Sequence, residues 1–183
     1  MRATPITVAA LAAALLLTAC DDNGGDGGTS KNGTSKNGTS QSKAGDACTL
    51  DGVAVQVAAS AAPGAGDSGN VTVTITNRGP KCTLNGFPGV GLRAGGDSST
   101  VPADKAAKAQ KLTLAKDATA SFTIAYVRGE AGGSTSLAVK TATFTLPGSS
   151  TAHSFKWSYG DVALKGGAST PNASVTAFQQ AGD

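Results

Sequence analysis

Apolar and polar residues alternate along much of the chain after residue 48, with the period of two that a strand with one buried face produces. The clearest run is 70–77, in which Val71, Val73 and Ile75 alternate with threonines. Further short apolar runs lie at 53–57, 82–84, 90–92, 111–114, 118–126, 137–139, 144–146, 155–159 and 162–164. We interpret 70–92 as the central strand pair of a small domain, with the other runs arranged around it.

Turn-forming residues separate these runs at intervals of about 8–12 residues, which is typical of a β-sandwich. Asn77-Arg78-Gly79-Pro80 ends the clearest run, and further turns are predicted at Lys116-Asp117 and Pro147-Gly148. Residues 94–110 are polar and predict a loop with at most one helical turn. The pattern therefore predicts an all-β fold, an antiparallel immunoglobulin-like β-sandwich of about seven to eight strands.

The pattern is less clear in three places, namely the segment 85–89, the region near residue 140 and the tail after Leu164. Asn85-Gly86 favours a two-residue hairpin, whereas Phe87-Pro88-Gly89 favours a type II turn or bulge, and the register of 90–92 depends on which one forms. The apolar positions change parity near Lys140-Thr141, which predicts a bulge or a strand boundary. After Leu164 the chain thins into small and polar residues, and we predict no strand there.

Residues 1–19 have the composition of a secretory signal peptide. Arg2 precedes an apolar run of 13 residues, 6–18, which is shorter than the roughly 20 residues that a spanning helix needs. The run ends in Leu17-Thr18-Ala19-Cys20, which resembles a bacterial lipobox, whose cysteine receives a diacylglyceryl group and becomes the first residue of the mature chain. Ordinary cleavage without a lipid is the alternative. We predict lipidation of Cys20, which places the protein on the outer face of the cytoplasmic membrane.

Residues 20–47 predict a disordered tether between this anchor and a domain at 48–183. After the cysteine the tether contains no large apolar side chain, and Thr-Ser-Lys-Asn-Gly occurs twice in succession. The acidic residues of 21–26 hint at a calcium loop, but the closing glutamate is missing, so we predict no metal site. Asn32 and Asn37 match the N-glycosylation sequon, but a lipobox indicates a bacterial source, in which such matches are usually empty. Glycosylation of the Thr and Ser hydroxyls of the tether stays open.

Charge, aromatic content and cysteine count narrow the classes of structure and partner. The chain has 15 basic and 12 acidic side chains and no clustered basic face, which argues against a nucleic-acid-binding surface. Aromatic residues are only 4% of the chain, so the core has to be built largely from Val, Leu, Ile and Ala. Cys20 is set apart by its position, which leaves Cys48 and Cys82 as a candidate disulfide in an exported chain. Two buried free thiols are the alternative.

One stretch of the chain resembles a known family. Cys82-Thr83-Leu84-Asn85-Gly86-Phe87-Pro88-Gly89-Val90, together with Cys48, the run at 71–77 and the region 153–157, is similar to a group of actinobacterial secreted proteins and lipoproteins that share an immunoglobulin-like domain of unknown function. The resemblance covers most of the predicted domain and implies a disulfide between Cys48 and Cys82. Many members have a second cysteine pair, which this chain lacks. The family brings no activity, so the resemblance implies no functional residues.

No constellation in the sequence predicts catalysis. Gly66-Asp67-Ser68-Gly69 resembles the nucleophile loop of trypsin-like serine proteases, but the following Gly-Pro is missing. The only histidine, His153, lies far downstream and has no recognisable partner acid. We predict instead that Ser68-Gly69-Asn70 is a turn into the next strand and that His153 is exposed at the start of a strand.

The leading hypothesis is a non-catalytic interaction module that is not an enzyme and uses no cofactor or metal. Its predicted partners are the membrane, through the anchor on Cys20, and an envelope protein or wall polymer, but no nucleic acid. Trp157 and Tyr159 offer a sugar-stacking face, although core packing beside Phe155 is the preferred interpretation. A small-ligand or glycan binder, and a cell-wall hydrolase with an unrecognised site, are the alternative functions.

Overall fold

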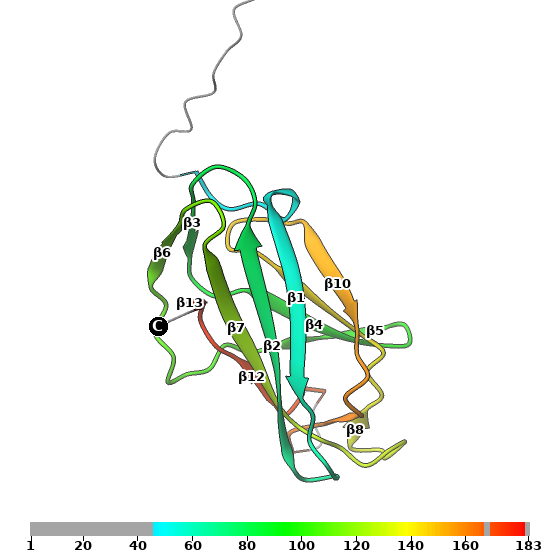
Figure 1. Cartoon of the computed structure of the whole chain (residues 1–183). Helices are drawn as coiled ribbons and strands as arrows, with labels where there is room; N and C mark the ends of the chain where they lie inside the picture. Colours follow the sequence, from blue (N-terminus) through cyan, green and yellow to red (C-terminus); the bar gives the residue numbers. More distant parts are fainter. Residues whose placement is uncertain (1–45, 167–168, 182–183) are drawn as a thin grey trace, which may run out of the picture. The chain divides into compact units, whose positions relative to one another are not determined.

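The structure, a computed structural model, describes residues 46–166 and 169–181. Cys20, the predicted signal peptide and the predicted tether up to residue 45 lie outside the described residues. Figure 1 labels most of the strands. The elements, in chain order, are η1 (Leu50–Gly52), β1 (Val53–Ser60), β2 (Ser68–Asn77), β3 (Cys82–Asn85), β4 (Gly89–Ala94), β5 (Asp97–Val101), β6 (Lys111–Leu114), β7 (Thr119–Val127), β8 (Ser136–Leu137), β9 (Thr141–Thr145), β10 (Ala152–Lys156), β11 (Val162–Ala163), β12 (Ala173–Val175) and β13 (Gln179–Gln180).

The strands form two main antiparallel sheets that share one hydrophobic core (Figure 1). One sheet has the order β1-β2-β7-β12, with β13 also paired to β7, and the other has the order β10-β9-β4-β5. Two-stranded ladders of β8 with β11 and of β3 with β6 complete the domain. The sheets meet directly, because the ring centroids of Phe122 in β7 and Phe144 in β9 lie 5.3 Å apart. The predicted all-β antiparallel sandwich is confirmed.

The alternating residues of β2 and β7 build the centre of this core. Three residues of β2 and their cross-strand neighbours in β7 are fully buried, namely Val71, Val73 and Ile75 opposite Ile124, Phe122 and Ala120. The threonines between them face the other side of the sheet, where the hydroxyl oxygens of Thr72 and Thr123 lie 3.2 Å apart. Stiff β-branched side chains pack well on such a pleated surface. The two strands that the alternation predicts most clearly are confirmed.

Three strands of the described residues lie where the sequence predicts none, because they carry little apolar signal. β5 lies within the polar segment 94–110 and forms a hairpin with β4 through Gly95-Gly96. Only Val101 of β5 is buried, so backbone pairing rather than an apolar face defines this strand. β12 and β13 lie in the tail after Leu164, and they are three and two residues long, which is too short to show a period.

The predicted central strand pair is wrong in its pairing. β2 pairs with β1 and β7, whereas β3, which begins at Cys82, pairs with β6. The connection at 86–88 is therefore no hairpin turn, because β3 and β4 belong to different sheets. Gly89 does not have the positive φ that a type II turn requires there, while Gly86 has a φ of 118°. Gly86 thus supplies the conformation through which the chain crosses between sheets.

The ends of several strands test the remaining predictions. Ser68-Gly69-Asn70, predicted as a turn, already belongs to β2 and pairs with β7, and the turn lies at 65–66 instead. The parity change near Lys140-Thr141 is a strand boundary, because it falls between β8 and β9. The turns predicted at Lys116-Asp117 and Pro147-Gly148 are confirmed.

Asn77, at the end of β2, is the one polar side chain that is buried in the part of the chain that the structure describes, with 1% of its surface exposed. Its Nδ2 group donates to the carbonyl oxygens of Pro80 at 2.8 Å, Leu114 at 3.1 Å and Ala115 at 3.2 Å. Its Oδ1 atom accepts a hydrogen bond from the Gly79 N–H at 3.0 Å. Both N–H donors of this buried amide are therefore used, and its oxygen accepts one hydrogen bond.

The backbone of Asn77 reinforces the same junction. Its N–H donates to the Ala118 carbonyl at 2.9 Å, and its carbonyl accepts from the Asp117 N–H at 2.7 Å. The next residue, Arg78, donates its N–H to the Gly52 carbonyl at 2.8 Å. Asn77 thus joins the loop after β2 to the turn between β6 and β7, and Arg78 ties the same loop to η1.

We expect Asn77→Ala to lower the free energy of unfolding by about 3 kcal/mol, because the substitution leaves three carbonyls and one N–H without their partner. Urea denaturation of the full chain, followed by far-UV circular dichroism, measures this loss.

Asn70→Ala is the matched control, since Asn70 lies on the same strand, is exposed and has no side-chain hydrogen bond among the described residues. It should change the free energy of unfolding by less than about 0.5 kcal/mol. Equal losses for the two variants would show that the Asn77 amide does not hold the junction.

Candidate functional site

Cys48 and Cys82 form a disulfide, with a distance of 4.9 Å between their Cα atoms. Both residues are buried, and the bond joins the segment ahead of η1 to the first residue of β3. The backbone continues this contact, because Cys48 N–H donates to the Thr83 carbonyl at 3.0 Å and Thr83 N–H donates to the Asp46 carbonyl at 2.9 Å. The predicted disulfide is confirmed, and the alternative of two free thiols is wrong.

The double variant Cys48→Ala/Cys82→Ala should lose about 4 kcal/mol of unfolding free energy, because a cross-link across 34 residues restricts the unfolded chain. Urea denaturation under non-reducing conditions measures the loss. The wild-type chain treated with a reducing agent should reach the same midpoint as the variant. A variant within about 1 kcal/mol of the oxidised wild type would contradict the expected contribution.

The residues that resemble a protease loop lie apart from the histidine in the topology. Ser68 begins β2 and pairs with Val127, whereas His153 lies in β10 of the other sheet. The Asp67 carboxylate accepts a hydrogen bond from the Gly64 N–H at 3.0 Å, so it orders the turn before β2. His153 is half-buried rather than exposed, and its ring centroid lies 5.3 Å from that of Phe144. None of the described hydrogen bonds joins these groups.

Two further features of the described ranges bear on the candidate sites. Within 46–166 and 169–181, no three His, Cys, Asp or Glu side chains gather closely enough to hold a metal ion. No helix in this part of the chain has the length and the apolar character needed to cross a membrane.

Trp157 packs in the core between two tyrosines. Its ring centroid lies 5.1 Å from that of Tyr126 and 5.0 Å from that of Tyr159, in edge-on contacts that suit aromatic quadrupoles. Its indole Nε1–H donates to the Gly160 carbonyl at 2.8 Å, and only 3% of the residue is exposed. The preferred prediction of core packing is confirmed for Trp157. The predicted strand over 155–159 is too long, since β10 ends at Lys156.

The Tyr126 ring also fixes the connection between β1 and β2. Its hydroxyl donates to the Tyr159 carbonyl at 2.8 Å and accepts from the Ala62 N–H at 3.2 Å. Gly69 lies directly against this ring, so that a Cβ atom there would come within 2.6 Å of Cε1 of the tyrosine. The Arg128 guanidinium donates to the Ala62 carbonyl at 2.8 Å and holds the same connection from the other side.

Gly69→Ala should destabilise the fold by about 2–3 kcal/mol, because the ring and the Ala62 backbone would both have to move. Thermal unfolding of the full chain measures the effect as a lower melting temperature. Gly96→Ala is the control, since Gly96 has open space around it and no positive φ. If Gly69→Ala and Gly96→Ala have the same melting temperature, the close approach of Tyr126 does not constrain position 69.

A groove with a volume of about 470 Å³ runs between β6 and β13. Its walls come from two segments far apart in the sequence, 107–112 and 177–180. Leu112 and Phe178 supply its apolar part, and both pack on the core. The sequence predicts a strand at 111–114 and a loop ahead of it, but nothing in it indicates that this part of the chain lies beside 177–180.

A β-bulge shapes one wall of this groove. Three residues lie between Val175 and Gln179, whereas two lie between their partners in β7, Ile124 and Ser121. The extra residue interrupts the alternation of inward and outward side chains. As a result Ala177 and Phe178 are both buried, although they are consecutive.

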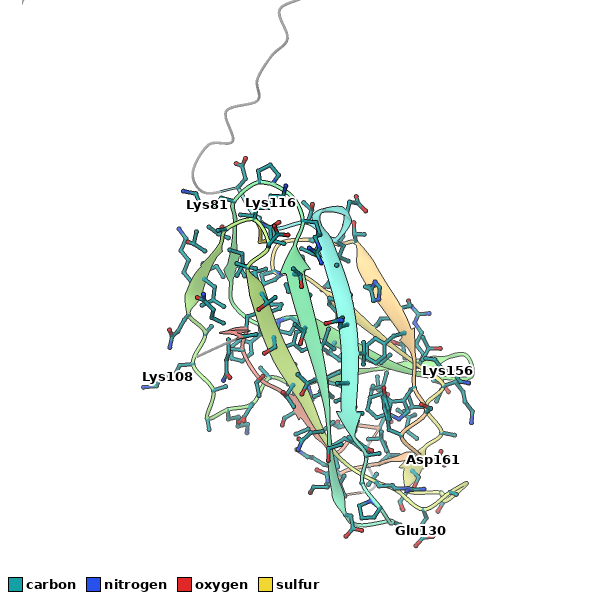
Figure 2. All side chains as sticks on the ribbon, viewed as in Figure 1. Lys81, Lys108, Lys116, Glu130, Lys156 and Asp161 are labelled. Carbon is teal, nitrogen blue, oxygen red and sulfur yellow. A yellow bond between two sulfur atoms is a disulfide. The ribbon has the colours of Figure 1, made fainter. Side chains whose placement is uncertain are left out.

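The polar groups of the groove lack partners of their own. The side chains of Gln110, Gln179 and Gln180 make no hydrogen bond within the described ranges, and all three are exposed. Lys108 also lines the groove, and its side chain extends outward from the domain (Figure 2). The only ion pair between described residues is Arg78–Asp117 at 2.9 Å, so Lys108 is not neutralised by a neighbouring carboxylate there.

Comparison with known proteins gives one match. Residues 48–179 match a family described as a domain of unknown function (DUF4232). No curated protein and no solved structure matches the chain.

Proposed function

The chain belongs to the DUF4232 family, a domain of unknown function, and we propose that it is an exported lipoprotein whose sandwich is a non-catalytic binding module. In this proposal Cys20 carries a diacylglyceryl anchor at the outer face of the cytoplasmic membrane, and residues 20–47 tether the domain to it. The module contacts an envelope protein or a wall polymer.

The disulfide is the observation that carries the exported location. Disulfides persist in oxidising compartments outside the cytoplasm and are rare inside it. The bond between Cys48 and Cys82 therefore agrees with the apolar run at 6–18 and with the lipobox-like Leu17-Thr18-Ala19-Cys20 ahead of it. These features together support the resemblance to actinobacterial secreted proteins and lipoproteins.

The strand order supports an immunoglobulin-like topology. In chain order, β1, β2 and β7 lie in one sheet and β4, β9 and β10 in the other, which corresponds to strands A, B and E against strands C, F and G. The disulfide differs from that of antibody domains, since it joins the segment ahead of β1 to β3 rather than bridging the sheets.

The groove between β6 and β13 supports a binding role. It combines an apolar floor with glutamine and lysine side chains that have no partner within the described part of the chain. A concave surface with a few free polar groups is the usual form of a recognition site.

Cys20→Ala should abolish lipidation and release the chain from membranes, because two or more acyl chains are needed for a durable anchor. Phase partitioning in a cloud-point detergent, with mass spectrometry of the amino-terminal peptide, measures both effects. The wild-type chain should enter the detergent phase with a modified Cys20, and the variant should stay in the aqueous phase or remain unprocessed.

Thr18→Ser is the matched control, because serine is also accepted at this lipobox position, and it should behave like the wild type. A Cys20→Ala chain that has lost the apolar run 6–18 and still enters the detergent phase at the wild-type level would overturn the anchor.

For the binding role, a photo-crosslinking residue at Gln110 in living cells should give one reproducible adduct, and the same residue at Gln56 on β1 should not. Absence of an adduct at Gln110 and at other exposed positions would contradict an interaction module.

A further inference from the structure

We infer that the groove between β6 and β13 accepts an extended, acidic segment of a partner protein, which adds a strand between these two edges. The inference rests on the proposed binding function and names the chemistry of its partner. It is carried by the free edges of the two strands, the bulge at 177–178 and the lysines beside the groove.

Both strands that flank the groove have a free edge. β6 pairs only with β3, and β13 pairs only with β7, among the strands that the structure describes. Ala181 N–H donates to the Thr119 carbonyl at 3.1 Å, so the alternation of an antiparallel ladder turns the backbone groups of Gln180 away from β7 and toward the groove. An extended peptide can therefore form main-chain hydrogen bonds to an existing edge, as in β-strand addition.

The stretch before β6 extends this edge. The last backbone hydrogen bond of the preceding turn runs from Ala107 N–H to the Asp104 carbonyl at 3.2 Å. Residues 108–110 then have no backbone hydrogen bond within the described ranges, although they run directly into β6. β6 itself has four residues, which at about 3.3 Å each gives a docking length of about 13 Å.

The bulge supplies a place for the side chains of the added strand. Because Ala177 and Phe178 are both buried, neither side chain projects outward from the segment between β12 and β13, as one of them would in a regular strand. Phe178 and Leu112 form an apolar floor there. Alternate residues of an extended segment point to one side, so small or β-branched residues would contact this floor while the intervening residues point outward.

Charge determines which outward residues fit. Lys108 lines the groove, and Lys105 and Lys111 lie three residues before and after it in the chain. All three are exposed, and none has a carboxylate within ion-pair distance among the described residues. Asp104 is the one acid in this stretch, and its carboxylate already accepts the Ala106 N–H at 2.9 Å. Acidic side chains at every second position complement this rim, and basic ones are repelled.

The probe is a fluorescent peptide of alternating glutamate and valine, seven residues long, and binding is measured by fluorescence anisotropy with the full chain solubilised from its host in a non-ionic detergent. We expect saturable binding that weakens with added salt. On binding, hydrogen exchange should slow at amides within 108–112 and at the Gln180 amide, because these groups lie on the two edges that the added strand occupies. A peptide of alternating lysine and valine should not bind.

Two comparisons separate strand addition from simple charge attraction. A peptide of alternating glutamate and proline has the same charge but cannot donate regular main-chain hydrogen bonds, so it should not bind. Lys108→Glu/Lys111→Glu should weaken binding of the first peptide by about tenfold. Lys140→Glu/Lys156→Glu, on the β9–β10 side of the other sheet, should leave it unchanged, and all variants should keep the wild-type melting temperature.

Equal binding of the proline peptide, or unchanged exchange at both edges, would overturn strand addition. Failure of the acidic peptide to bind a chain that still enters the detergent phase and still gives the Gln110 adduct would overturn this inference while the proposed function stands. Loss of the membrane anchor with peptide binding intact would overturn the proposed lipoprotein and leave the groove as assigned.

Discussion

Closure of the sandwich at the end where η1 lies depends on one buried amide. The Asn77 side chain satisfies three carbonyls and one N–H at the point where the loop after β2 meets the turn between β6 and β7. Any displaced arrangement would leave a desolvated group without a partner, so the network defines one geometry. The disulfide constrains the same region, because Asn77 and Cys82 line one small hollow. Two constraints of different chemistry therefore hold a core that is poor in aromatic residues.

The features that the sequence predicts correctly do not depend on which strand pairs with which. The alternation in 70–77 and 118–126 reports one buried face without reference to the partner strand, and β2 and β7 form as expected. Two cysteines in an otherwise cysteine-free domain likewise leave a single pairing, and the bond between Cys48 and Cys82 forms. The turn residues Lys116-Asp117 mark a strand end through backbone preference alone, and Asp117 has a φ of 64°.

The features that the sequence does not predict depend on distant partners. β5 has only one buried residue, and it is a strand because its backbone pairs with β4. β13 is likewise a strand because its backbone pairs with β7. The pairing of β3 with β6 rather than with β2 is likewise a choice between ladders that no local pattern specifies. The groove could not be predicted either, because its walls come from two distant segments. Nothing in the sequence around Gln110 or Gln179 indicates that the two segments lie side by side.

The groove follows from which strands occupy the two edges of β7. β2 takes one edge and the carboxyl-terminal strands β12 and β13 take the other, so β6 pairs with β3 although only a short turn separates it from β7. The edges of β6 and β13 are consequently left open, and an open edge is a template for unwanted pairing with other chains. Short strands and lysines are two means by which proteins limit that pairing, and this edge has both, with four residues in β6 and lysines at 105, 108 and 111. The same positive charge that repels a second copy of this edge leaves an acidic strand as the complementary occupant.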